Sequence, residues 1–143
     1  GYRQCLKNYG IPYDKNLLAQ TDYSLTGGRD SVKKLLSLQN PPTAVFCSND
    51  FLALGAMKGA REMGLNLPAD LSIVGFDDIQ IASYIIPGLT TIRQPAYEMG
   101  KLGAKLLFQR IKNQGKPEQL MLKSSLIVRD STVRTRNIIE NVC

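Results

Sequence analysis

Histidine is absent from all 143 residues of the chain. Its absence excludes Ser-His-Asp and Cys-His catalysis, together with every metal site that needs an imidazole ligand. Apolar runs are also short, and none approaches the roughly 20 residues of a membrane-spanning helix. Hydrophobic residues still make up 43% of the sequence, enough for a packed core. We therefore expect a folded domain with no membrane partner, no metal site and no bound cofactor.

Cysteine is scarce, with only Cys5, Cys47 and Cys143 in the sequence. Their odd number, their wide spacing and the lack of a C-x-x-C pair favour reduced thiols in a cytosolic protein over a disulfide framework. Residues 1–5 contain neither the apolar core of a signal peptide nor an initiator Met, and they are typical of the middle of a helix. We therefore expect a cytoplasmic protein and a truncated chain.

The net charge of +6 is concentrated in the last third of the sequence. Residues 1–92 carry 8 Lys/Arg against 8 Asp/Glu, whereas residues 93–143 carry 10 against 4. A basic segment of this kind can contact nucleic acid. The favoured interpretation is a solvated helix face, because Lys101, Lys105 and Lys112 fall on one predicted helix.

Hydrophobic periodicity divides the chain into alternating helices and strands. The expected helices are 2–9, 27–39, 50–63 and 97–112, with a helical turn or two within 79–86; the expected strands are 16–22, 43–47, 71–76 and 90–93, with strand-like runs in 119–129. A turn is expected at 115–117 and a polar tail after Ser131. The runs at 43–47 and 71–76 are typical of strands buried on both faces. The βαβ alternation predicts an α/β fold with a doubly wound parallel sheet.

Polar side chains follow every predicted strand, at residues 21–23, 47–50, 77–78 and 93–94. Ligands of open α/β sheets bind beyond the carboxyl ends of the strands. Carboxylates and amides hydrogen-bond paired hydroxyl groups, and an aromatic ring such as that of Tyr23 packs on C–H faces. The sequence therefore favours a sugar-like or other small polar ligand, bound above all by Asn49 and Asp77.

Each of these residues also has a structural interpretation. Asn49 is equally suited to capping the next helix, and Asp50 is better suited to the first helical turn, where the helix dipole favours an acid. Asp77 and Asp78 are also a plausible turn pair. Gly27-Gly28 before a helix is a weak phosphate-binding signal, because no dinucleotide or P-loop motif surrounds it.

An enzymatic interpretation stays open at this point. Asp77 and Asp78 after a buried strand are suited to holding Mg²⁺ for phosphoryl transfer. Such a site usually adds a further acid or a Lys on a neighbouring strand end, and Asp22 and Asp50 are available.

Several sequence blocks occur in a fixed order along almost the whole chain. They are PTAVFCSND at 42–50, ALGA at 53–56, SIVGFDD at 72–78, PGLTTIRQP at 87–95 and LIVRDST at 126–132. In this order the blocks resemble the LacI/GalR family of bacterial transcriptional regulators. The resemblance implies an effector domain like the periplasmic sugar-binding proteins, with a ligand between two α/β lobes.

The resemblance also implies how the chain is divided. Residues 1–92 would belong to the C-terminal lobe, 93–122 would be a crossover strand and helix of the N-terminal lobe, and 123–143 would be the return strand and tail. The implied function is effector sensing by a repressor rather than catalysis. Its partners would be a sugar or sugar phosphate, a second copy of the protein, and DNA through a helix-turn-helix that this sequence does not contain.

Residue roles follow from the same resemblance. Tyr23 matches a ring that stacks on the effector, Asn49 and Asp77 match hydrogen-bonding positions, and Gln94 lies beside the pocket. Leu54, Ala82, Tyr84 and Ile85 match parts of a dimer interface. A family arginine that grips the effector and most of the N-terminal lobe are outside this sequence, so we expect open sheet edges that invite association.

Two alternatives to the repressor remain. A periplasmic sugar-binding protein of the same architecture is disfavoured by the free thiols and by the block at 89–95. The Mg²⁺-dependent phosphotransfer enzyme depends on Asp77 and Asp78 holding a metal.

Overall fold

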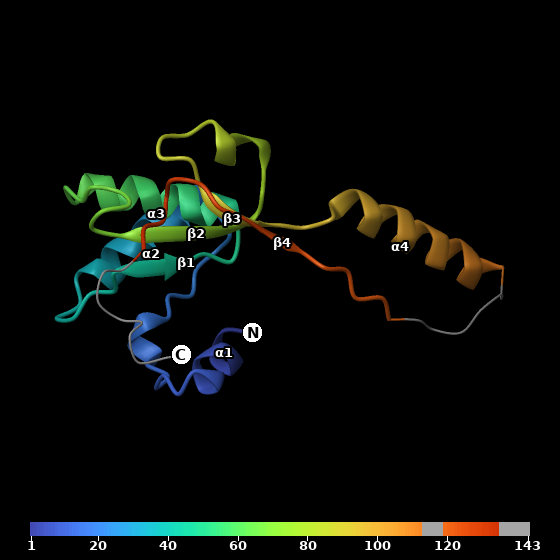
Figure 1. Cartoon of the computed structure of the whole chain (residues 1–143), viewed down its shortest axis with the longest axis horizontal. Coiled ribbons are helices and arrows are strands. Elements are labelled where there is room, and N and C mark those ends of the chain that lie inside the picture. Colours follow the sequence, from blue (N-terminus) through green and yellow to red (C-terminus); the bar gives the residue numbers. More distant parts are fainter. Residues whose placement is uncertain (113–118, 135–143) are drawn as a thin grey trace.

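A computed structural model describes residues 1–112 and 119–134. Figure 1 shows a body that contains the sheet and an arm that ends in one long helix. The helices are α1 (Tyr2–Asn8), α2 (Leu25–Leu36), α3 (Asp50–Glu62) and α4 (Ala96–Ile111), and the 3₁₀ turns are η1 (Lys15–Leu17) and η2 (Gln80–Ser83). The strands are β1 (Ala44–Phe46), β2 (Ser72–Asp77), β3 (Thr90–Arg93) and β4 (Ser125–Ile127).

The described strands form one sheet in the order β1-β2-β3-β4. β1 pairs with β2 and β2 with β3 in parallel, whereas β4 runs antiparallel to β3. The register places Phe46 opposite Val74 and Asp77 opposite Arg93. The predicted α/β class with a mostly parallel sheet is confirmed.

Two predictions about strands are wrong. Residues 16–22 do not form a strand, because Asn16 N–H donates to the Asp14 carboxylate over 2.8 Å and starts the turn η1 instead. β1 is not buried on both faces, since it lies at the edge of the sheet and Phe46 is 57% exposed. The turn predicted at 115–117 and the tail beyond residue 134 lie outside the described residues.

Side chains at the helix starts fix α2 and α3. The Ser24 hydroxyl accepts a hydrogen bond from Gly27 N–H, so α2 begins two residues before its predicted start. α2 and α3 then pack so closely that a Cβ atom at Gly28 would collide with the Leu52 carbonyl, and one at Gly55 with the Leu25 carbonyl. Gly28 therefore serves helix packing, and a Cβ atom at Gly27 would collide with the Asp22 and Thr21 side chains, so close packing accounts for both glycines without a phosphate.

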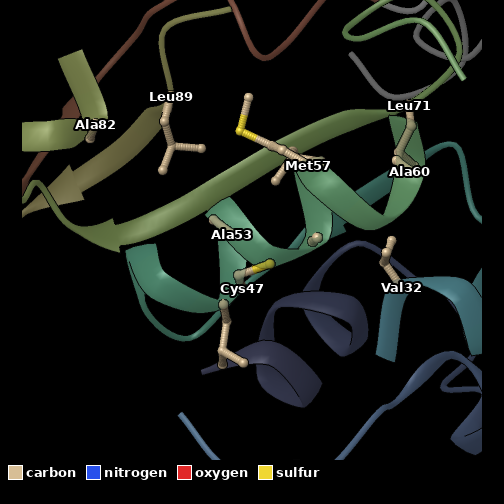
Figure 2. Close-up of a cluster of buried hydrophobic side chains, with 11 residues drawn as sticks. Val32, Cys47, Ala53, Met57, Ala60, Leu71, Ala82 and Leu89 are labelled. Carbon is tan, nitrogen blue, oxygen red and sulfur yellow. The ribbon is translucent and has the colours of Figure 1, made fainter. Parts of the chain in front are cut away.

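The core lies between these helices and the sheet (Figure 2). Ala53, Ala56 and Ala60 on α3 are buried, and their small side chains let that helix approach its neighbours. Leu71, Ile73 and Leu89 fill the sheet side of the core and are fully buried. Burial of each such side chain contributes roughly 1.5–3 kcal/mol to the stability of the fold. The core therefore holds the strands, and the residues at their ends, in fixed positions.

The arm differs from the body in its burial. β3 leads out to α4 and β4 leads back (Figure 1), and no residue of α4 is buried. Leu107, Phe108 and Ile111 of α4 are exposed. Within the described ranges, every helix is too short or too polar to cross a membrane.

Candidate functional site

The predicted site residues form two contacting pairs, Asp77 with Gln94 and Asn49 with Tyr23, and Asn49, Asp77 and Gln94 follow the carboxyl ends of neighbouring strands. Asn49 and Asp77 each follow by three positions a residue of the Phe46–Val74 register pair. Because β1 and β2 are parallel neighbours, both side chains start from the same level of the sheet. Gln94 follows directly after β3, whose last residue is in register with Asp77.

Asp77 and Gln94 are in direct contact. The Gln94 side-chain amide Nε2 donates to Asp77 Oδ1 over 2.6 Å, and both residues are partly buried. Asp77 has a φ of 118°, a conformation that residues other than glycine rarely adopt. Backbone strain of this kind concentrates at ligand sites, where the surrounding structure holds it in place.

Tyr23 and Asn49 form the second half of the site. Asn49 Oδ1 accepts from Leu52 N–H at 2.8 Å, which confirms the capping interpretation. The other end of the same amide, Nδ2, faces the Tyr23 carbonyl at 3.5 Å. The Tyr23 side chain is 70% exposed, so its ring is available for stacking on a ligand.

Asp22 is the acid next to this ring. Its carboxylate accepts from the Ser24 hydroxyl at 2.7 Å, and this bond is the main cause that lowers the pKa of Asp22 below its usual value. Asp22 is therefore ionised at neutral pH, and it adds negative charge close to Tyr23.

Asp50 serves the fold. Its side chain is fully buried; Oδ1 accepts from the Thr91 hydroxyl at 2.6 Å and Oδ2 accepts from Ile79 N–H at 2.8 Å. These bonds tie the start of α3 to β3 and to the segment before η2. The structural interpretation of Asp50 is thus supported, although its partners are distant in sequence and the helix dipole alone did not point to them.

Asp78 is held by two arginines. Arg93 Nε lies 2.5 Å from Oδ2 and Arg129 Nη2 lies 2.7 Å from Oδ1. Burial raises the pKa of Asp78, but the hydrogen bonds and charges of the two guanidinium groups outweigh it and lower the pKa overall. Sequence patterns did not single out Arg129, which lies in the block LIVRDST and also donates to the Leu89 carbonyl at 2.7 Å.

These contacts weaken the Mg²⁺ hypothesis. Asp78, one of the pair that it depends on, and Asp50, one of the two candidates for the further acid, already use both carboxylate oxygens in hydrogen bonds or ion pairs. Residues 1–112 and 119–134 contain no cluster of three or more acidic or cysteine side chains suited to a metal ion.

A separate hollow lies beside α3 and the segment after η2. Its volume is about 460 Å³ and its lining includes Leu54, Arg61 and Ile85. Tyr84 is 72% exposed, whereas Ala82 is fully buried in the core. Of the four residues assigned to a dimer interface, Leu54 and Ile85 share this hollow and Ala82 faces the interior.

Known proteins resemble this chain over nearly its whole length. A family model described as a periplasmic binding protein-like domain matches residues 1–132. The HTH-type transcriptional repressor CytR of Escherichia coli is 43% identical over 134 residues, 92% of this chain and 39% of that protein. The transcriptional regulator CelR, solved as a cellobiose complex, aligns with a TM-score of 0.86 and 34% identity over 91% of this chain and 40% of its own. A LacI family regulator from Enterococcus faecium with bound ribose aligns with a TM-score of 0.82 and 39% identity. The alignment covers 92% of this chain and 49% of that regulator. The chain spans about two fifths of the length of the curated relatives it matches.

Proposed function

Because the chain belongs to the periplasmic binding protein-like family, as an effector-binding domain of the LacI type, we propose that it senses a small sugar-like molecule for a transcriptional repressor. Its relatives are transcriptional regulators rather than enzymes. The resemblance and the fold class predicted from the sequence are thereby confirmed.

The observation that carries the proposal is the hydrogen bond between Asp77 and Gln94 at the strand edge. A carboxylate beside an amide matches two neighbouring hydroxyl groups, which donate to the acid and exchange hydrogen bonds with the amide. Asn49 extends this polar set and Tyr23 offers an exposed ring. Cellobiose and ribose, bound by two similar regulators, are ligands of this chemical class.

The shape of the chain supports a two-lobed arrangement. Residues 1–92 would form the C-terminal lobe, 93–122 the crossover into the second lobe, and 123–143 the return. The exposed apolar face of α4 is consistent with packing inside a second lobe. Effector binding would then select one angle between the lobes.

A homodimer fits the surface beside α3. Leu54 and Ile85 line the hollow, Tyr84 is exposed next to Ile85 in the sequence, and Ala82 would support this surface from inside. DNA contact would come from a helix-turn-helix elsewhere in the complete regulator, and the protein would act in the cytoplasm.

The first test is a ligand screen on the complete regulator. Thermal shift with D-ribose, cellobiose, sugar phosphates and purines identifies an effector, and calorimetry then gives its affinity. Asp77→Ala should weaken binding by about 2–4 kcal/mol, because it strands the hydroxyl groups that the carboxylate accepts from.

Asp130→Ala is the matched control, since this exposed aspartate takes part in no ion pair among the described residues. Its affinity should equal that of the wild type. An Asp77→Ala protein that binds the effector with unchanged affinity would rule out the proposed site.

A further inference from the structure

Asp78 lies where three segments of the chain meet. It directly follows β2, Arg93 is the last residue of the outgoing strand β3, and Arg129 follows the return strand β4 by two positions. One carboxylate therefore connects the end of the central strand to both strands of the arm (Figure 1).

The burial of the Asp78 carboxylate distinguishes it from the proposed ligand contacts of Asp77, Gln94, Asn49 and Tyr23. The Asp78 side chain is only 7% exposed and each of its oxygens already meets a guanidinium group. A sugar hydroxyl would have to displace an ionic hydrogen bond to reach it. Asp78 is thus poorly placed to contact a ligand and well placed to hold the arm.

Arg129 is anchored more firmly than Arg93. Its Nη1 donates to the buried Leu89 carbonyl at 2.7 Å, and its backbone N–H donates to the Thr90 hydroxyl at 2.9 Å. Its side chain is 17% exposed, whereas that of Arg93 is 56% exposed. The segment after the return strand is therefore anchored by several side-chain bonds of Arg129. The end of the outgoing strand is held by its pairing with β2 and β4, and Asp78 is the ionic partner that fixes the Arg93 side chain.

The negative charge of Asp78 is needed because it lies between two positively charged side chains. Without its carboxylate, two guanidinium groups would face each other across a partly buried space, and like charges repel more strongly there than in water. The repulsion would act most on Arg93, the more exposed of the two arginines, at the end of β3 where the chain leaves the body for the arm.

We propose that Asp78 is a positioning residue that fixes the direction of the crossover arm and thereby couples it to the ligand contacts of Asp77 and Gln94. Neighbouring residues 77 and 78 hold neighbouring residues 94 and 93, so the ligand contact and the ion pair share one backbone turn. Asp78 has a φ of 59°, so this turn has two successive residues with positive φ. A ligand that separates the Gln94 amide from Asp77 would exert a force on this turn. Asp78 would keep Arg93 in place while the ligand is bound.

The coupling part rests on the proposed function, whereas the direction of the arm is measurable without any ligand. Spin labels at Lys34→Cys on α2 and Lys105→Cys on α4 report the position of the arm relative to the body. The background is Cys5→Ser and Cys143→Ser in the full 143-residue chain, and Cys47 stays because it is buried. Dilution with unlabelled chain removes distances between copies.

Pulsed dipolar spectroscopy should give one narrow distance distribution for the unmodified Asp78. Asp78→Asn should widen it about twofold, because the arm then samples a range of orientations. Asp78→Glu, which keeps the charge, should restore much of the narrow distribution. Asp130→Asn removes an exposed carboxylate from the same return segment and should change nothing.

Two further measurements distinguish a variant that does not fold from a proposal that is wrong. Circular dichroism and thermal melting show whether Asp78→Asn folds. If it does not, Arg93→Gln is measured instead, because it removes the ion pair at the end of β3 and keeps Asp78 paired with Arg129. A narrow, unchanged distribution in the folded variants would overturn the proposal, and so would equal widening in Asp130→Asn. Effector binding to the wild type, measured separately by thermal shift, decides the proposed function independently of the arm.

Discussion

At the residue scale, single polar groups at the strand ends serve both the fold and the site. Asn49 caps α3 with its oxygen and faces Tyr23 with its nitrogen. Asp77 accepts a hydrogen bond from Gln94, while the adjacent Asp78 is paired with two arginines. Substitutions here therefore need paired readouts of stability and binding, because one side chain can contribute to each.

Cys47 gives a residue-scale prediction that needs no ligand. Burial, with a smaller contribution from the charge of Asp50, raises the pKa of its thiol to about 12. The thiolate is the reactive form, and a raised pKa removes it at pH 8. In a Cys5→Ser, Cys143→Ser background, Ellman's reagent should not react with the native protein at pH 8 and should react with one thiol after unfolding in guanidinium.

A Cys47→Ser version of the same protein is the control, and it should give no reaction in either state. Rapid labelling of native Cys47, at the rate of a small-molecule thiol, would contradict the buried position of this side chain. The outcome also decides whether Cys47 is safe to retain in the spin-label experiment.

The site residues differ in how far sequence predicts them. Asn49, Asp77 and Gln94 follow apolar runs, and the parallel register converts that local pattern into spatial proximity. The partners of Asp78 and Asp50 lie up to 51 and 41 positions away, and they depend on a strand pairing that no local pattern encodes. For the same reason no local pattern indicates the role of Arg129.

At the element scale, contact between α2 and α3 determines how the body packs. Gly55→Ala should lower the free energy of unfolding by about 1–3 kcal/mol, because the added methyl meets the Leu25 carbonyl and forces the helices apart. Urea denaturation followed by circular dichroism measures the change.

Gly103→Ala is the matched control on α4. No heavy atom lies within 4 Å of a Cβ built at that position, so the change should be neutral or should stabilise the helix by up to about 1 kcal/mol. Equal stability of the Gly55→Ala protein and the wild type would show that the two helices have room to separate.

Element boundaries show where local pattern and tertiary structure disagree. The helix expected at 50–63 agrees closely with α3, since Asn49 provides a cap and small apolar residues recur at helical spacing. The strand expected at 16–22 failed because two adjacent leucines, Leu17 and Leu18, suit a strand, whereas the Asp14 carboxylate favours a turn. A short apolar run also gives no sign that β1 forms an edge, because that depends on the neighbours it lacks within the described sheet.

At the scale of the whole molecule, the body has a second apolar opening besides the hollow beside α3. A groove of about 530 Å³ runs beside the outer edge of β1, and Leu17, Leu18, Val45 and Phe46 are among its lining residues. The N–H and C=O groups along an edge strand are free to pair with another chain, and an apolar lining adds a hydrophobic drive to that pairing. The expectation of association made from the sequence thus acquires a specific surface.

We expect the 143-residue chain to associate in a concentration-dependent manner, with Phe46→Lys shifting it towards the monomer. A lysine at this edge keeps the strand but puts a charge where an incoming chain would pack, and a charge there is costly to bury. Size-exclusion chromatography with light scattering over a series of concentrations measures the mass. Met121→Lys replaces an apolar side chain that is 97% exposed and distant in sequence from the groove, so it should associate like the wild type. A wild-type chain that stays monomeric throughout the series would show that the groove is closed in solution. If the Phe46→Lys protein still associates, the contact lies on another face. The exposed side of α4 is then the next surface to substitute.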